Sequence, residues 1–418
     1  MSNTTKKFSL HEDWVVVILG FLIILLAIAG IRPLTPVYNW NTASDFSIKI
    51  LDGVNLGKIG IQFLLVLVVA FIGVLFTGKP VKYFLIAFPL VYVVSVIALL
   101  LAGNKAIKGF NLEAVIFSLT IGLIISNLFK LPEWFRAALS TELFVKIGLV
   151  LLGTSIIFSD ILKAGAYGLL QALVVVISVW YFAFWLCKKM KVDSELTMMI
   201  ASAVSICGVS AAIATSGAIK GDSKKLSLVI SLVLICAIPM MIGMPYIASW
   251  LGLSQEVTGA WLGGSIDTTG AVVASGSLVG EEALKISTIV KFSQNVLLGV
   301  AAFAISVYWT WNKKAADAET EKPTLGVIWE RFPKFVLGFI AASLLFSFVL
   351  QAETITAVKD GLKNLQSVWF VLAFTSIGLE TKFSDLLKNT NRKPMYAFLI
   401  AQLFNVIVTL MIAYLLFR

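Results

Sequence analysis

Two glycine-broken apolar segments decide the fold of this chain: Ala203-Val-Ser-Ile-Cys-Gly-Val-Ser-Ala-Ala-Ile-Ala214 and Leu262-Gly-Gly-Ser-Ile-Asp-Thr-Thr-Gly-Ala-Val-Val-Ala-Ser-Gly276. Lipid offers no partner to backbone N–H and C=O groups. A helix interrupted at membrane depth is therefore tolerated only where it faces protein or a water-filled cavity. Secondary transporters place such interruptions around a substrate midway across the bilayer. Asp267 is an ionisable residue inside the second segment, and it marks the region where function is expected.

The composition is that of an integral membrane protein. Hydrophobic residues make up 59% of the 418 residues, charged residues make up 13%, and the mean hydropathy is +0.95. Soluble domains contain about 25% charged residues. We expect an all-α protein with about eleven transmembrane helices. The whole chain, residues 1–418, is expected to form a single polytopic domain in the cytoplasmic (inner) membrane. The first apolar run, residues 14–31, is interpreted as an uncleaved helix, although Lys6 and Lys7 before it imitate a signal peptide.

Charge and motif content exclude several classes of protein. The net charge is +10, but the basic residues lie in short loops between apolar runs, which indicates membrane topology and not nucleic-acid binding. The three cysteines lack the spacing of a zinc site or a disulfide framework, and the one histidine, His11, lies in the N-terminal tail. Motifs for ATP phosphates, for a zinc protease or for a nucleophile–base pair are missing. We therefore expect no enzyme, no metal site and no cofactor beyond a coupling ion.

The distribution of charged loops predicts how the broken segments are placed. With a cytoplasmic N-terminus, the basic loops all fall inside only if neither segment crosses the membrane fully. The expected inside positions then include Lys220, Lys224 and Lys225, and the expected outside positions include Glu256 and Glu281. We predict two re-entrant or discontinuous elements, one entering from each face. Whether the two segments are hairpins or crossing broken helices is left open.

An internal repeat accompanies the two segments. Residues 153–163, Gly-Thr-Ser-Ile-Ile-Phe-Ser-Asp-Ile-Leu-Lys, recur at an offset of 225 as residues 378–388, Gly-Leu-Glu-Thr-Lys-Phe-Ser-Asp-Leu-Leu-Lys. Inverted-topology repeats are typical of secondary transporters. Asp160 and Asp385 within the repeat are interpreted as helix caps and not as functional acids. Residues 143–311 include both broken segments and are predicted to form the substrate-carrying group, and residues 312–334 are predicted to be a cytoplasmic loop.

The residues around the breaks form a candidate binding site. Asp267 is expected to couple transport to H⁺ or Na⁺, and Lys291 to balance charge. Free N–H groups at half-helix ends would attract an anion. Each role has a structural alternative, because small residues also permit close helix packing, an Asp can cap a helix, and a Lys can snorkel to the interface. The candidate substrate-binding residues are Ser205, Cys207, Gly208, Ser210, Gly264, Ser265, Thr268, Thr269 and Asn295.

These residues resemble a known family. Ser205-Ile-Cys-Gly-Val-Ser-Ala-Ala-Ile-Ala214, Gly264-Ser-Ile-Asp-Thr-Thr-Gly-Ala-Val-Val-Ala-Ser-Gly276 and Gly148-Leu-Val-Leu-Leu-Gly153 are similar to the YeiH-type family, to which sulfate export is attributed. The resemblance covers most of the chain. It implies an inverted-repeat fold like that of NhaA antiporters and bile-acid symporters, and transport of a small anion. The family more often has a His-Glu pair where this chain has Asp267-Thr268, which leaves the substrate and coupling ion open.

The sequence therefore favours a secondary transporter that moves a small anion, such as sulfate, sulfite or an organic sulfonate or carboxylate, with export as the expected direction. Its expected partners are this anion and the lipid bilayer, with no nucleic acid, and a homodimer is left open. A Na⁺/H⁺-type cation antiporter on the same fold is the first alternative, with Asp267 holding the cation directly. A channel or sensory subunit is a weaker alternative, because no ring of pore-lining charge and no appended soluble domain is present.

Overall fold

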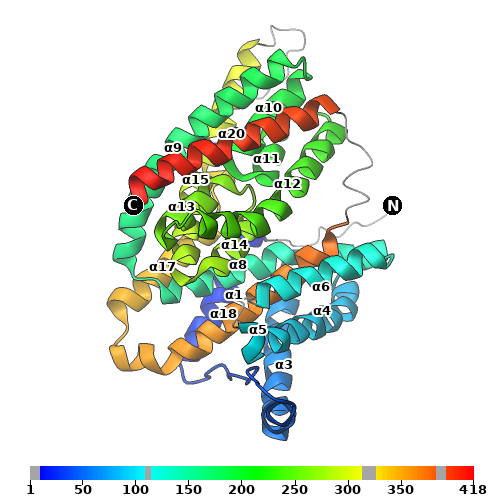
Figure 1. Cartoon of the computed structure of the whole chain (residues 1–418), viewed down its shortest axis with the longest axis vertical. Helices are drawn as coiled ribbons and strands as arrows, with labels where there is room; N and C mark the ends of the chain where they lie inside the picture. The colour runs from blue at the N-terminus through cyan, green and yellow to red at the C-terminus, as the bar shows by residue number, and fades with distance from the viewer. Residues whose placement is uncertain (1–9, 109–113, 313–325, 383–391) are drawn as a thin grey trace, which may run out of the picture. The chain divides into compact units, whose positions relative to one another are not determined.

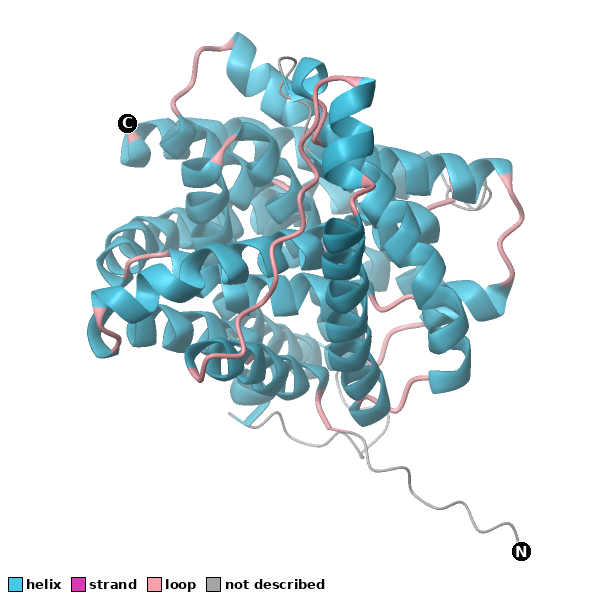
Figure 2. Ribbon diagram, turned by 90° about the horizontal axis from the view of Figure 1, so that it is seen from below, coloured by secondary structure: helices cyan, strands magenta, loops and turns pink. Residues whose placement is uncertain are grey.

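The computed structural model describes residues 10–108, 114–312, 326–382 and 392–418. Within these ranges the secondary structure is helical, apart from one isolated bridge between Trp40 and Asn104 (Figure 2). Seven of the described helices are long and apolar enough to cross a membrane, and shorter apolar helices accompany them. The chain is thus a multi-pass all-α membrane protein, as predicted. The predicted total of about eleven spans and the NhaA-like fold stay predictions.

The chain forms two compact units. Unit 1 comprises residues 1–159 and 334–382, and unit 2 comprises residues 160–333 and 383–418. Both broken segments lie in unit 2, whereas residues 143–159 of the predicted group 143–311 lie in unit 1. The described elements of unit 1 are α1 (Glu12–Ile28), α2 (Ala43–Asp45), η1 (Phe46–Ile50), α3 (Gly53–Phe76), α4 (Val81–Ala102), α5 (Lys105–Lys108), α6 (Ala114–Leu128), α7 (Glu133–Ala138), α8 (Thr141–Leu152), η2 (Gly153–Ser155), α17 (Phe335–Leu344), η4 (Leu345–Val349) and α18 (Ala352–Glu380).

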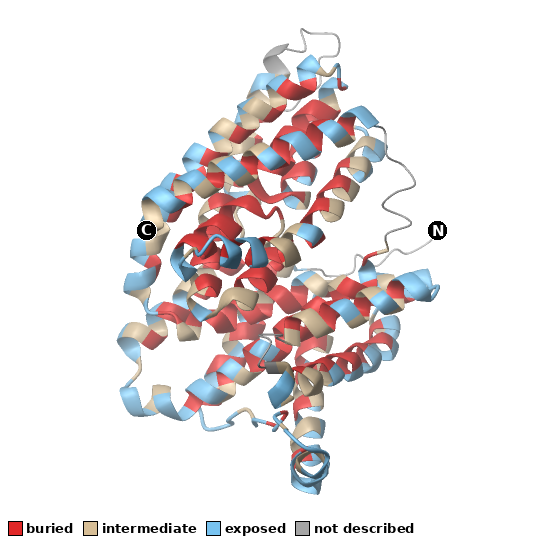
Figure 3. Ribbon diagram, in the orientation of Figure 1, coloured by how far each residue is buried: buried red, intermediate tan, exposed pale blue. Residues whose placement is uncertain are grey.

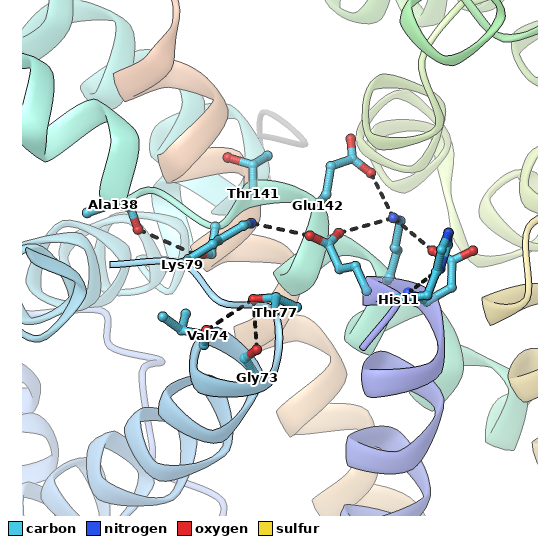
Figure 4. Close-up of polar contacts among 12 residues, drawn as sticks. His11, Gly73, Val74, Thr77, Lys79, Ala138, Thr141 and Glu142 are labelled. Carbon is cyan, nitrogen blue, oxygen red and sulfur yellow. Dashed lines mark hydrogen bonds and ion pairs between the residues drawn. The ribbon is translucent and has the colours of Figure 1, made fainter. Parts of the chain in front are cut away.

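Close backbone contact and an ion-pair cluster hold unit 1 together. An added Cβ at Gly122 of α6 would lie 2.9 Å from the Gly378 Cα of α18, so only glycine permits this approach. In the middle of α8, the Lys146 Nζ lies 3.1 Å from Glu12 Oε1 and 3.0 Å from Asp13 Oδ1 of α1. Figure 4 shows this cluster with Lys79 and Glu142 at its edge. The second Asp13 oxygen accepts the Lys334 N–H before α17 at 2.9 Å, so one carboxylate joins α1, α8 and α17.

Unit 2 is built from long helices around two short broken elements (Figure 1). Its elements are α9 (Phe158–Lys189), α10 (Ser194–Ser202), the π-helical turn η3 (Ala203–Cys207), α11 (Val209–Ile219), α12 (Ser223–Trp250), α13 (Gln255–Ser265), α14 (Thr269–Val279), α15 (Glu281–Asn312), α16 (Gly326–Arg331) and α20 (Arg392–Phe417). Within the predicted loop 312–334, residues 313–325 lie outside the described ranges and α16 occupies 326–331. The second copy of the repeat beyond Lys382, including Asp385, also lies outside them, whereas Asp160 lies in the first turn of α9, where the helix dipole favours a carboxylate.

Residues 194–219 form a helical hairpin, here called hairpin 1. Its two ends meet, because the Lys225 Nζ at the start of α12 lies 2.8 Å from Asp193 Oδ1 and 3.2 Å from Glu195 Oε2 at the start of α10. The Asp222 N–H also donates to Glu195 at 3.1 Å. Burial raises the pKa of Asp193, but the hydrogen bonds from Lys225 and from two backbone N–H groups outweigh it and hold that pKa below its ordinary value.

Residues 255–279 form a second helical hairpin, hairpin 2. Its ends also meet, since the Gln255 side chain lies against Gly280 and its Oε1 accepts the Ala283 N–H at 3.4 Å. Gly280 has φ +153°, which suits the sharp reversal between α14 and α15. Each broken segment therefore forms a helical hairpin whose two ends lie together, and its re-entrant placement in the membrane stays a prediction. Hairpins, and not crossing broken helices, are the form observed.

Helix α12 separates the mouths of the two hairpins, where the mouth is the end at which a hairpin begins and ends. Its 28 residues span about 42 Å at 1.5 Å per residue, more than the hydrocarbon core of a bilayer. The mouth of hairpin 1 lies at its start and the mouth of hairpin 2 beyond its end, so the hairpins enter from opposite ends of unit 2. The outer helices α9 and α20 lie antiparallel, with ring contacts between Tyr167 and Phe417 and between Phe182 and Phe404. Figure 3 shows the hairpins buried and the outer helices exposed on one side, as lipid-facing helices are.

Candidate functional site

The tips of the two hairpins meet inside unit 2. Hairpin 1 turns at Gly208, with φ +56° and ψ −112°, a conformation that residues with a Cβ rarely adopt. A Cβ added there would lie 2.9 Å from the Asp267 Cβ of hairpin 2. Hairpin 2 turns at Ile266–Thr268, between the last residue of α13 and the first of α14. Each tip thus brings one helix C-terminus and one helix N-terminus to the same place.

Amide side chains from α15 and α20 cap the carbonyl ends at both tips. Backbone carbonyls in the last turn of a helix lack an intrahelical donor and, when buried, need another one. The Gln294 Nε2 donates to Ser205 O of hairpin 1 at 2.8 Å and to Gly264 O of hairpin 2 at 3.3 Å. The Asn405 Nδ2 donates to Val204 O at 3.0 Å and to Ser265 O at 3.3 Å. Two amides therefore bridge the two tips and satisfy four of their carbonyls.

Lys291 of α15 completes this capping. It is 1% exposed, and its Nζ donates to Ile206 O at 3.0 Å and to Gln294 Oε1 at 2.8 Å. An ammonium group has three N–H donors, and the described residues provide partners for two of them. No ion pair joins Lys291 to Asp267 within the described ranges, and the two interact by Coulomb attraction at longer range. A buried positive charge thus lies at the carbonyl end of hairpin 1, where a helix dipole stabilises it.

The amide ends of the two tips are the N-termini of α11 and α14. Helix α11 starts after Gly208 and α14 after Thr268, and each is 11 residues long. The Thr268 hydroxyl accepts from the Ala271 N–H at 3.4 Å, and the Thr269 hydroxyl accepts from the Asn295 Nδ2 at 3.2 Å. Both hydroxyls act there as acceptors and retain their O–H donors. These N-termini offer partial positive charge to an anion.

Asp267 lies between these two N-termini. The residue is 2% exposed, and its Oδ2 has no hydrogen-bond partner among the described residues. A buried carboxylate oxygen without a partner is costly, so such a group often binds a ligand or a proton, or changes its surroundings during function. The Asp267 Oδ2 is thus one of several buried oxygens of the site without a hydrogen-bond partner among the described residues, together with the Ser265 Oγ and the Asn295 Oδ1.

The structure brings the predicted residues to one region but gives them different surroundings. The Ser205 hydroxyl donates to Ala201 O at 2.7 Å, inside its own helix, so its side chain already has a partner. Gly264 allows Gln171 of α9 and Thr409 of α20 to approach its backbone. Cys207, Gly208, Ser265 and Asn295 are buried, Thr268 and Thr269 are half-buried, and Ser210 is exposed. Among the described residues no cluster of three His, Cys, Asp or Glu side chains could hold a metal ion.

Sequence reasoning missed three capping amides. Gln171 donates to Ala260 O at 2.8 Å, Gln402 donates to Ser265 O at 2.8 Å, and Asn405 bridges the tips. All three lie inside long apolar helices, α9 and α20, that read as plain membrane spans. An amide in the middle of an apolar helix needs a protein partner, and this was the available signal. The identity of the partner depended on the fold.

Comparisons with known proteins agree with this membrane architecture. A family model described as "Conserved hypothetical protein 698" matches residues 86–397. A UPF0324 membrane protein of Rhodopirellula baltica is 40% identical over 352 residues, which are 82% of this chain and 64% of that protein. A UPF0324 membrane protein of Nitratidesulfovibrio vulgaris is 39% identical over 360 residues, 83% of this chain and 62% of that protein. The chain thus spans less than two thirds of the length of these relatives. No solved structure matches it.

Proposed function

Because this chain belongs to the YeiH-type family of membrane proteins and joins two helix N-termini at a buried charged site, we propose that it is a secondary transporter of a small anion. The anion would be sulfate, sulfite or an organic sulfonate or carboxylate, exported across the cytoplasmic membrane by alternating access. The N-terminus would be cytoplasmic, and the protein would act as a carrier and not as an enzyme.

The observation that supports an anion is the asymmetry between the capped helix carbonyls and the helix N-termini at the tips. The carbonyls that a cation would need, at Val204, Ser205 and Gly264, already accept hydrogen bonds from Asn405 and Gln294. The tips also present two helix N-termini and the hydroxyl groups of Thr268 and Thr269, which suit an anion. Lys291 adds a positive charge with one remaining N–H.

The two hairpins also suit alternating access. Their mouths lie at opposite ends of α12, so a ligand at the tips would be reached past one hairpin from either side. The amides that bridge the tips would keep the binding groups in register while access changes from one side to the other. Asp267 would take up H⁺ or Na⁺ in the same cycle, because its carboxylate would otherwise repel the anion.

A cation antiporter is the second candidate, and one observation favours it. The Asp267 Oδ2 is a buried oxygen without a partner, as a residue that exchanges H⁺ for Na⁺ would be. In that case the free helix N-termini would stabilise the ionised carboxylate and no anion would bind.

Thermal unfolding of detergent-purified protein separates the candidates. Sulfate, sulfite, thiosulfate, taurine, bicarbonate and small carboxylates would be added as Na⁺-free salts at several pH values. A ligand at 100 times its Kd stabilises the folded state by about 2.7 kcal/mol. We expect one anion class to raise the unfolding temperature, with the response lost in Thr269→Val and kept in the control Ser231→Ala on the exposed side of α12. A response to Na⁺ or pH and to no anion would replace the proposal by the cation antiporter.

A further inference from the structure

One face of α9 is exposed and apolar over much of its length. Its residues recur three or four positions apart, so they lie on one side of the helix, and each is between 45% and 66% exposed. They are Leu170, Val174, Ile177, Tyr181 and Trp185. Two lysines follow, with the Lys188 Nζ 5.6 Å from the centre of the Phe184 ring and the Lys189 Nζ 4.9 Å from that of the Trp185 ring. Apolar, aromatic and basic side chains thus succeed one another toward the C-terminus of α9.

Helix α20 shows the same order at the same end of unit 2. Its exposed apolar residues lead back to the exposed Tyr396, and then to Arg392 and Lys393 in its first turn, which are also exposed. Because α9 and α20 lie antiparallel, the first turn of α20 is at the end where α9 finishes. The exposed apolar residues of α20 include Ile400, Leu403 and Ile407. Both helices therefore carry their cations at one end of the pair.

These cations have no acidic partner among the described residues. The five cations, all exposed and outside any ion pair there, are Lys188, Lys189, Lys191, Arg392 and Lys393. The two acids that follow α9, Asp193 and Glu195, both pair with Lys225 instead. Like charges at one surface repel each other unless counter-ions lie among them. At a membrane surface, anionic lipid headgroups supply such counter-ions.

Lys191 has a backbone conformation that ordinarily belongs to glycine. Its φ is +57°, and it follows α9 in a turn where its N–H donates to Lys188 O at 3.0 Å and the Val192 N–H donates to Cys187 O at 2.9 Å. Helices that end in this way usually have glycine at this position, because a Cβ is costly there. The helix dipole is already complemented by Lys188 and Lys189 in the last turn. Membrane topology favours basic residues at this end but does not require one in this conformation, whereas a negatively charged ligand at the corner accounts for it.

We infer that these five cations form a site, here called the headgroup site, for the phosphate of an anionic phospholipid. The lysines supply point charges, and the planar guanidinium of Arg392 matches two phosphate oxygens. Trp185 and Tyr396 lie at the level of the glycerol, and the acyl chains follow the apolar faces of α9 and α20. The inference goes beyond the proposed function, because it does not depend on which ion the protein carries.

Thermal unfolding of the full chain in an uncharged detergent tests the site, since a ligand that binds only the folded state raises the unfolding temperature. Phosphatidylglycerol is titrated against phosphatidylcholine with the same acyl chains, and glycerol phosphate serves as the soluble headgroup. We expect a saturable rise with phosphatidylglycerol that weakens with added salt, and no rise with the other two. A rise that phosphatidylcholine or glycerol phosphate reproduces overturns the lipid site.

Two matched double variants separate a site from diffuse attraction. Lys189→Gln with Lys393→Gln removes one cation from each helix and should raise the half-saturating fraction of phosphatidylglycerol about 30-fold. Lys220→Gln with Lys224→Gln removes the same charge from exposed lysines at the mouth of hairpin 1 and should raise that fraction less than about threefold. An equal effect of the two double variants overturns the headgroup site, because it shows a general attraction to anionic surfaces.

Lys191→Gly should act in opposite directions on stability and on lipid binding. Glycine suits the backbone conformation, so without lipid the variant should unfold at a higher temperature than the wild type. The loss of one cation should at the same time raise the half-saturating fraction of phosphatidylglycerol about fivefold. A lysine with a purely structural role would leave this fraction unchanged, and that result would contradict the inference.

Discussion

Replacing Gly208 by alanine perturbs the contact between the two hairpin tips. Gly208 has φ +56° and ψ −112°, and a Cβ there would lie 2.7 Å from the Val233 Cγ1 and 2.9 Å from the Asp267 Cβ. Neither neighbour can move aside easily. The Asp267 Cβ is attached directly to the backbone of hairpin 2, and Val233 is fully buried on α12.

Two costs add at this position. A residue with a Cβ held in a sparsely populated backbone region costs of order 1–3 kcal/mol, and an extra methyl group in a packed core costs about 1–3 kcal/mol. We expect Gly208→Ala to destabilise the joined tips by about 3 kcal/mol. If the tips separate to relieve the clash, the N-termini of α11 and α14 no longer converge, and about 3 kcal/mol corresponds to roughly a 100-fold loss of ligand affinity.

The assay is thermal unfolding of detergent-purified protein with and without ligand, compared with Gly243→Ala. Gly243 lies inside α12 with open space around it, so alanine there should be neutral or should stabilise the helix by up to about 1 kcal/mol. Adding Val233→Ala to Gly208→Ala removes one of the two clashes and should restore part of the stability and of the ligand response. If Gly208→Ala unfolds and binds like Gly243→Ala, the tight joint between the tips is refuted.

Three further substitutions test the caps and the hairpin mouth. Gln294→Leu leaves two buried carbonyls without a donor, which costs about 1–3 kcal/mol each. It should therefore lower the unfolding temperature clearly more than the control Ser293→Ala, because the Ser293 hydroxyl bonds to Ile289 O within α15. Lys291→Met should abolish the anion response while a pH or Na⁺ response persists, and an unchanged anion affinity would exclude Lys291 from the site. Asp193→Asn keeps the helix cap but removes the ion pair with Lys225. The pKa of Asp193 is lowered in the folded state, so the ion pair stabilises the protein above the unfolded pKa of about 3.9, and this stabilisation is lost as pH falls through the folded pKa. At pH 7 the variant should therefore lose under about 1 kcal/mol of stability and unfold at a slightly lower temperature. In strong acid it should match the wild type.

Much of this architecture could be predicted from local sequence. Gly208 and Gly264 mark the tips because only glycine tolerates the backbone form or the close approach found there. The meeting of the two ends of hairpin 1 agrees with the charge pattern, which predicted Lys225 on the same side as the start of that hairpin. These signals are local or statistical, and they do not depend on which helices become neighbours.

The caps could not be predicted in the same way. Asn405 reaches Val204 across 201 residues, and Gln402 reaches Ser265 across 137 residues. In a single sequence an amide inside an apolar helix indicates that a partner exists, but its identity depends on packing between distant helices. The missing ion pair between Lys291 and Asp267 has the same origin, because Ile206 O and Gln294 turn the ammonium group toward hairpin 1.

The dependence of the tips on α20 has a consequence for biosynthesis. Helix α20 is the last described element to leave the ribosome, and it carries Gln402 and Asn405. Until it inserts, Val204 O and Ser265 O lack these donors, and polar backbone must stay hydrated or bound to other factors in the membrane. The two hairpins can therefore pack against each other in their final form only after α20 has been made, so the central site would be completed later than the helices that carry its two tips.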